Sequence, residues 1–101
     1  MAIGKLTPLQ IGTALTDLPG WAVDADKMAL YREIRLADFA ETFALMTRIA
    51  LAAEKADHHP EWSNVYNRLS IRLTTHEAGG ITTRDLALAE AINGFLGEKR
   101  E

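Results

Sequence analysis

The chain has 101 residues, of which 48% are hydrophobic and 25% are charged, a composition typical of one folded domain (residues 1–101) and not of a disordered or fibrous protein. Its formal net charge of -3 disfavours direct binding to nucleic acid or to an anionic membrane. The absence of cysteine excludes disulfides, thiolate metal sites and a cysteine nucleophile, and no apolar run reaches the ~20 residues needed to cross a bilayer, so we expect a cytoplasmic protein.

The first expected element is a short helix between residue 8 and Pro19-Gly20. Thr7 can cap its start, and Pro8 suits the first helical position. The roughly helical spacing of apolar residues predicts its buried face, which consists of Leu9, Ile11, Leu15 and Leu18.

Residues 21–36 predict a β-hairpin. A weak alternation over 21–24 and a turn over 25–27 lead into a longer strand over 28–36. Because successive side chains of a strand point to opposite faces, that strand should have two distinct faces. One face carries Met28, Leu30, Arg32, Ile34 and Leu36, and the other carries Tyr31, Glu33 and Arg35.

The strongest periodic signal predicts a long helix over residues 39–55. Asp38 and Glu41 have the spacing of a capping box at its start. Pro60 disfavours helical geometry at the residue before it, so the helix should end before the histidine pair at 58–59. Its expected core-facing stripe is Phe39, Phe43, Met46, Ala50 and Ala53, with Ile49 beside it.

Alternation over residues 64–76 predicts a third strand, and a loop containing Gly79-Gly80 leads to a last helix. Thr82 and Asp85 form a second capping-box pattern at the start of that helix. The expected core residues are Val65, Leu69, Ile71 and Leu73 of the strand and Leu86, Ala89, Ile92 and Leu96 of the helix. The order α-β-β-α-β-α predicts an α+β fold, with an antiparallel sheet of three to four strands and helices packed on one face.

All three histidines, His58, His59 and His76, lie in one acidic stretch over residues 54–85. Histidine changes its charge near neutral pH, so such a cluster can both donate and accept protons. The spacing of a metal site is absent, and neighbouring histidines project in different directions. Surface loop histidines, or for His76 a half-buried residue bonded to the backbone, remain the alternatives. No nucleophile triad, phosphate loop or paired-carboxylate spacing is present, which favours a histidine acid/base site.

Other residues near the histidines have both a structural and a functional interpretation. Glu54 can be a solvated helix charge, and Asp85 can be a helix cap alone. Trp21 and Trp62 are more typical of core or rim aromatics than of ligand platforms. Glu54 and Asp57 lie at a helix end that favours cations, and such a local conflict points to function.

In combination, these residues closely resemble the signature of the pterin-4a-carbinolamine dehydratases. The resemblance covers most of the chain and begins upstream at Gly20-Trp21. It continues through Arg32, Asp38-Phe39 and Phe43. Its most specific motifs are His-His-Pro at 58–60, Tyr66, Thr-His at 75–76 and Gly-Gly-x-Thr-x-x-Asp at 79–85.

The resemblance implies removal of water from a 4a-hydroxytetrahydropterin to give the quinonoid dihydropterin, without a metal or bound cofactor. This reaction supports recycling of tetrahydrobiopterin after an aromatic amino-acid hydroxylase has used it. The implied acid/base pair is His58 and His76, and His59 is a pterin contact that can share the work. The implied roles of the other residues are orientation of imidazoles or pterin binding for Glu54, Asp57 and Asp85, ring stacking for Trp21 and Trp62, and fixation of the histidine turn for Pro60.

The resemblance also implies homodimers or homotetramers. Two alternative functions remain. The first is a binding module that stabilises the dimers of a transcription factor, for which Leu88 and Phe95 offer apolar surface on the last helix. The second is an enzyme that acts on another pteridine.

Overall fold

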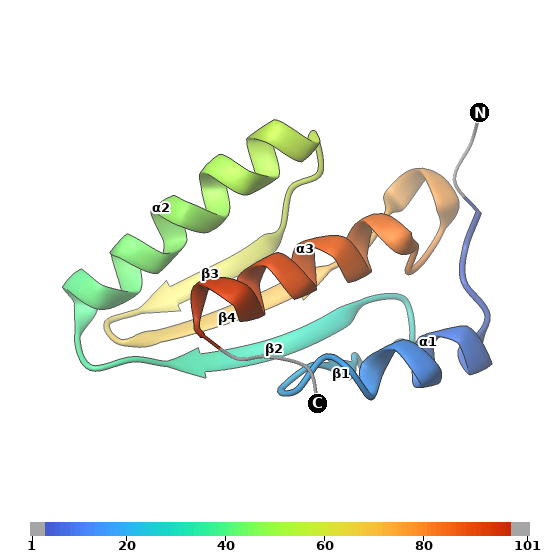
Figure 1. The fold of residues 1–101 in the computed structure, drawn as a ribbon, viewed down its shortest axis with the longest axis horizontal. Coiled ribbons are helices and arrows are strands. Elements are labelled where there is room, and N and C mark those ends of the chain that lie inside the picture. Colours follow the sequence, from blue (N-terminus) through green and yellow to red (C-terminus); the bar gives the residue numbers. More distant parts are fainter. Residues whose placement is uncertain (1–3, 98–101) are drawn as a thin grey trace.

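The computed structural model describes residues 4–97, and the chain there forms an α+β fold. Its elements are α1 (Pro8–Leu15), β1 (Ala22–Val23), β2 (Leu30–Arg35), α2 (Phe39–Ala56), β3 (Glu61–Val65), β4 (Arg68–Leu73), the 3₁₀ turn η1 (His76–Ala78) and α3 (Thr83–Phe95). The four strands form one antiparallel sheet in the order β1-β2-β4-β3. Helices α2 and α3 lie over the same face of this sheet (Figure 1), which confirms the expected fold class. No helix within residues 4–97 has the length and hydropathy that a membrane span requires.

The fourth strand arises from a tight hairpin inside the segment that was expected to be one strand. Tyr66 and Asn67 alone join β3 to β4. Tyr66 has a left-handed φ of 53°, and the side-chain amide of Asn64 donates to the carbonyl oxygens of Tyr66 at 3.1 Å and Arg68 at 2.9 Å. Because the chain reverses here, Val65 lies on the solvent side and is 61% exposed. The expected core position of Val65 is therefore wrong.

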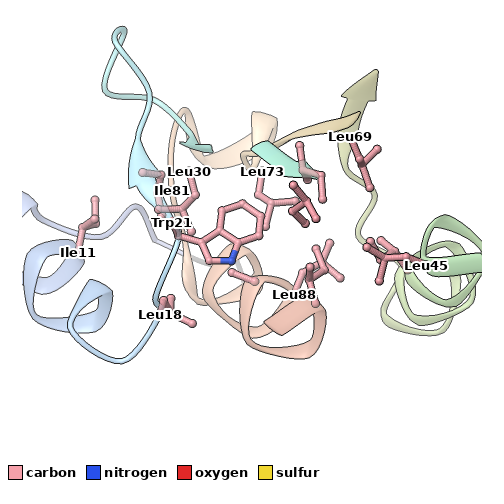
Figure 2. Close-up of a cluster of buried hydrophobic side chains, with 14 residues drawn as sticks. Ile11, Leu18, Trp21, Leu30, Leu45, Leu69, Leu73, Ile81 and Leu88 are labelled. Atoms are coloured by element: carbon pink, nitrogen blue, oxygen red, sulfur yellow. The ribbon is translucent and has the colours of Figure 1, made fainter. Parts of the chain in front are cut away.

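The core lies between the sheet and the two helices that cover it. Along β2 and β4, buried residues alternate with exposed or half-buried ones, which confirms the expected faces of both strands. Figure 2 shows the Trp21 ring in the middle of this cluster, with Leu30, Leu73 and Leu88 around it. Burial of apolar surface is worth roughly 25 cal/mol per Å², and the cluster includes residues of β2, β4, α2 and α3, so it holds both helices on the sheet.

A polar junction beneath Trp21 explains two residues of the upstream resemblance. The Trp21 indole N–H donates to Asn93 Oδ1 at 2.9 Å, and Arg32 Nη1 donates to the same oxygen at 2.6 Å and to the Pro19 carbonyl oxygen at 3.1 Å. Gly20 has a φ of +87°, and a Cβ there would lie 2.5 Å from the guanidinium carbon of Arg32. The positive φ favours glycine, and a Cβ here would have to displace the Arg32 guanidinium from its hydrogen bonds. Gly20 and Arg32 therefore serve the fold at this position.

Helix α2 has the expected ends, but its buried face is rotated from the expected one. The Asp38 carboxylate accepts the N–H of Glu41 at 2.8 Å, as expected for an N-cap. Phe39 and Phe43, however, are 48% and 56% exposed. Apolar residues occupy a wider part of the helix circumference than the sheet and α3 cover. The expected stripe was centred on the part that remains exposed. The buried residues are Thr42, Leu45, Ile49 and Ala53.

Two further expectations about helix faces are wrong. Leu9 is 80% exposed, because the short helix α1 reaches the core through Ile11 on a different side. Leu88 is 4% exposed and belongs to the core, so it offers no docking surface. Phe95 is half-buried, and the guanidinium of Arg48 lies 4.5 Å from its ring centroid. Of the expected apolar docking surface on α3, Leu88 is therefore part of the core and Phe95 is only partly exposed.

Candidate active site

The C-terminus of α2 directs its two following histidines to different environments. Asp57 has a left-handed φ of 54°, and the N–H of His58 donates to the Ala53 carbonyl oxygen at 3.1 Å. This hydrogen bond closes the helix end and turns the chain sharply. As a result the His58 side chain is only 10% exposed, whereas that of His59 is 56% exposed.

Asp85 is completely buried beneath His58 and binds three groups. Its Oδ1 lies 2.6 Å from His58 Nε2. Its Oδ2 accepts the backbone N–H of Thr82 and the hydroxyl of Thr75, each at 2.9 Å. A carboxylate accepts hydrogen bonds and a neutral imidazole donates through its protonated nitrogen, so an Nε2-protonated ring satisfies this contact. Asp85 is thus both the capping acid of α3 and the partner of a histidine.

The pair formed by His59 and Glu54 lies at the surface. His59 Nε2 and Glu54 Oε1 are 2.9 Å apart, and the two side chains are 56% and 81% exposed. An exposed ion pair of this kind contributes little to folding free energy. Its effect is to orient the imidazole, again through Nε2.

His76 is the first residue of η1 and is separated from the end of β4 by Thr74 and Thr75. Its Nε2 lies 2.9 Å from Oε2 of Glu61, the first residue of β3. The other oxygen of Glu61 accepts a hydrogen bond from Arg72 Nη1 at 2.9 Å. The His76 side chain is 80% exposed, so this hydrogen bond, and not packing, determines how the ring is held.

The three histidines line one cavity of about 230 Å³ and share one hydrogen-bonding pattern. Each ring binds a carboxylate through Nε2. Within residues 4–97, no protein group is hydrogen-bonded to Nδ1 of any of the three. In a neutral imidazole with a protonated Nε2, Nδ1 carries the lone pair. The cavity is lined by Asp57, His58, His59, Thr74, His76, Glu77 and Arg84.

The structure brings some of the expected site residues to this cavity and leaves others away from it. Asp57 lines the cavity. Glu54 and Asp85 do not line it, but they are hydrogen-bonded to His59 and His58, which do. Pro60 follows His59 and ends the turn that leads into β3. Trp21 is 6% exposed in the core, and Trp62 is half-buried against it. Neither tryptophan lines the cavity, so their expected stacking on a ligand receives no support.

Sequence reasoning missed five residues that shape the site, one of which is Thr74 in the cavity wall. Arg84 and Glu77 line the cavity, Thr75 binds Asp85, and Glu61 binds His76. Thr75 and Arg84 were inside the recognised motifs, adjacent to His76 and Asp85, so their position was an available signal. Glu61 also lies inside the stretch that carries the resemblance, directly after Pro60, but its pairing with His76 required the β3–β4 register.

Electrostatics separate Glu61 from an ordinary surface acid. The hydrogen bond from the Arg72 guanidinium lowers the pKa of Glu61 below its usual range, burial opposes this effect, and the hydrogen bond from His76 adds to the lowering. Glu61 is therefore ionised at neutral pH. Among residues 4–97, no three histidine, aspartate or glutamate side chains are grouped so that they could hold a metal ion.

The fold and the site together define a small α+β domain with three histidine–carboxylate pairs at one cavity. Residues 4–95 match the family model described as pterin 4 alpha carbinolamine dehydratase. The chain belongs to this family of dehydratase enzymes.

Individual relatives agree with the family model over nearly the whole chain. A protein of Novosphingobium aromaticivorans is 47% identical over 95% of this chain and 100% of its own length. One of Rhizorhabdus wittichii is 54% identical over 94% of this chain and 98% of its own length. Both are provisionally named pterin-4-alpha-carbinolamine dehydratases. A Brucella melitensis crystal structure, described as a transcriptional coactivator/pterin dehydratase, superposes with a TM-score of 0.88 at 40% identity and covers 90% of this chain and 97% of its own.

Proposed function

We propose that this protein removes water from a 4a-hydroxytetrahydropterin and releases the quinonoid dihydropterin. The observation that carries the proposal is the meeting of three histidine–carboxylate pairs at one cavity, in a chain of the dehydratase family. A reductase would return the product to the tetrahydro form. In a cytoplasm that contains an aromatic amino-acid hydroxylase, the reaction would therefore support recycling of tetrahydrobiopterin.

The proposed chemistry is one elimination with balanced proton transfers. A base takes the proton from ring nitrogen 5, the nitrogen electrons form a double bond to carbon 4a, and the carbon–oxygen bond breaks. Hydroxide is a poor leaving group, so an acid gives the oxygen a proton and water departs. We assign His58 and His76 to this acid/base pair, with their Nδ1 atoms as the exchanging sites. The base is the neutral ring, which accepts the proton at Nδ1, and the acid is an imidazolium, which carries a proton on Nδ1 as well as on Nε2. His59 contacts the pterin and shares the work.

Charged groups at the cavity would orient a flat, polar ring. The cavity of about 230 Å³ lies just below the roughly 300–1,000 Å³ of typical ligand pockets, as suits a small bicyclic ring that is partly open to solvent. Asp57 lines the cavity and can accept hydrogen bonds from the pterin amino group. Arg84, which also lines the cavity, can donate to the ring carbonyl.

A hydroxylase-coupled absorbance assay tests the proposal by following decay of the 4a-hydroxy intermediate. The wild-type protein should accelerate this decay. His58→Ala and His76→Ala should each lower kcat by roughly 10² to 10⁴, the usual worth of a positioned proton transfer. Arg68→Gln is the control, because Arg68 pairs with Glu33 away from the cavity. A wild-type protein without effect on the decay would refute the function, and a fully active His76→Ala would refute the assignment of His76.

A second proposal concerns assembly, and it rests on the exposed apolar edge of α2. Phe39 and Phe43 are 48% and 56% exposed, and their ring centroids are 5.9 Å apart. We propose that this edge is covered in a homodimer or homotetramer. Alternatively, the same edge binds a different protein, either a dimerising transcription factor or a hydroxylase. The description of the Brucella relative as a transcriptional coactivator/pterin dehydratase supports this alternative.

Light scattering after size exclusion separates these uses of α2. Phe43→Glu should lower the mass of a homo-oligomer, because a charge cannot be buried there without a partner. Ala44→Glu is the matched control, because it adds the same charge to an exposed position on another side of α2. A wild-type monomer would contradict self-association and leave partner binding as the use of this edge.

A further inference from the structure

Arg72 lies at the centre of a chain of ion pairs on the solvent face of the sheet. Its Nε donates to Asp24 Oδ2 at 2.8 Å, and its Nη1 donates to Glu61 Oε1 at 2.9 Å. Its Nη2 donates to Asp26. All three nitrogens of the guanidinium are therefore engaged, two of them by the β1–β2 turn and one by β3. The second oxygen of Glu61 continues the chain to His76.

We propose that Arg72 and Glu61 are positioning residues that hold the His76 ring with Nε2 protonated and Nδ1 left for proton exchange. This inference deepens the function proposed above and rests on it wherever catalysis is concerned. Neither residue lines the cavity. Both would therefore act through His76 and not through contact with the pterin.

The position of His76 explains why such support is needed. Its side chain is 80% exposed on a 3₁₀ turn, so packing restricts the ring little. His58, in contrast, is held by the buried carboxylate of Asp85. The two proposed proton-transfer groups are thus oriented by different means, one from the protein interior and one from the outer face of the sheet.

The sheet itself fixes the support. Glu61 and Arg72 are directly paired residues in the β3–β4 register, where side chains on the same face lie about 4.5–5.5 Å apart at Cβ. Arg72 is 26% exposed, and its planar fork is fixed by two further carboxylates. A guanidinium binds several carboxylates in fixed directions, whereas an ammonium behaves as a point charge. Arginine is thus the residue type that can clamp Glu61 in one orientation.

The first test measures the His76 ring directly and needs no activity. Nitrogen-15 NMR of labelled protein, at a pH where the imidazole is neutral, reports which nitrogen carries the proton. The wild-type ring should show the Nε2-protonated form. In Arg72→Gln and in Glu61→Gln the Nδ1-protonated form should rise several-fold, with a smaller rise in Arg72→Lys. The control Arg68→Gln removes a neighbouring surface arginine on β4 and should leave the His76 signals unchanged.

The second test is kinetic and looks for coupling of Arg72 and Glu61 to His76. Arg72→Gln and Glu61→Gln should each lower kcat by roughly tenfold, a fraction of the 10² to 10⁴ supplied by a positioned proton transfer. KM should remain unchanged, because neither residue lines the cavity. In a His76→Ala background, both substitutions should have no further effect on kcat.

The outcomes separate this inference from the proposed function. Unchanged His76 tautomers in both Arg72→Gln and Glu61→Gln would overturn the positioning role, even in an active dehydratase. Full multiplication of the Arg72→Gln and His76→Ala effects would overturn it as well. An altered tautomer combined with a fully active His76→Ala would support the positioning role and refute only the catalytic assignment of His76.

Discussion

At the scale of single residues, Asp85 links the fold to the chemistry. One carboxylate caps α3 through the Thr82 N–H and holds His58 through Nε2. The sequence pattern alone allowed a cap without a further role. The structure joins both roles because residues 58 and 85, far apart in the chain, meet where the end of α2 packs on the start of α3.

We expect Asp85→Asn and Asp85→Ala to separate these two roles. The asparagine oxygen can still accept the Thr82 N–H, but its amide would face His58 and require the opposite imidazole tautomer. Asp85→Asn should therefore retain the cap while lowering dehydratase kcat at least about tenfold. Asp85→Ala should lose roughly 1 kcal/mol more folding free energy than Asp85→Asn. Urea unfolding and the coupled assay measure the two effects, and equal stability of both variants would contradict the capping contribution.

Asp57 offers a test of backbone strain at the same site. Its φ of 54° is left-handed, a conformation that glycine adopts freely and alanine does not. Asp57→Gly and Asp57→Ala both remove the carboxylate, so they differ mainly in backbone freedom. Asp57→Gly should be more stable than Asp57→Ala by about 1 kcal/mol in urea unfolding. The reverse order would contradict a left-handed residue at this helix end.

At the scale of elements, local signals predicted most ends correctly and some faces incorrectly. The Thr7-Pro8, Asp38 and Thr82 patterns each mark a helix start that the structure confirms. Capping depends on a few adjacent residues, so it is readable from sequence. Burial of a helix face depends on what packs against it, which is why Phe43 was expected inside and is exposed. The contact between Glu61 and His76 depends on the register of β3 and β4, so the sequence alone could not predict it either.

The β3–β4 hairpin shows the same limit and allows a direct test. Tyr66 is not a typical turn residue, yet its φ is 53°, and a positive φ at the first position of a two-residue hairpin loop favours glycine. Tyr66→Gly should therefore raise the unfolding free energy by roughly 0.5–1 kcal/mol, since the side chain is 61% exposed and loses little packing. Thermal unfolding of Tyr66→Gly should be compared with that of Val65→Ala. Val65→Ala shortens the adjacent exposed side chain and serves as the control. A destabilised Tyr66→Gly would contradict strain at this turn.

At the scale of the whole molecule, the ion pairs of Arg72 tie the β1–β2 turn to the opposite edge strand. Hydrogen bonds from Arg72 lower the pKa of Asp24 below its ordinary 3.8 and that of Glu61 below its ordinary 4.5. The folded pKa lies below the unfolded one in both cases. These groups therefore stabilise the fold above their ordinary pKa values, and the contribution disappears as pH falls through the lowered values.

The resulting pH dependence can be measured by urea unfolding between neutral and acidic pH. The free energy of unfolding of the wild-type protein should begin to fall as the pH drops below about 4.5. Arg72→Gln should reduce the steepness of this fall, because Asp24 and Glu61 then titrate more nearly as they do in the unfolded chain. Arg68→Gln provides the comparison for loss of a surface arginine. An identical acid slope in the wild-type protein and Arg72→Gln would contradict the pairing.

The cap at the start of α3 also makes the site observable without any ligand. Because the Thr82 amide donates to the carboxylate that holds His58, its hydrogen can exchange with solvent only when that carboxylate lets go. The exchange rate of this single amide therefore counts how often the first turn of α3 opens. An opening that moves the Asp85 carboxylate away from both partners would also free the His58 ring, so slow exchange of this amide would report that the His58–Asp85 pair is held.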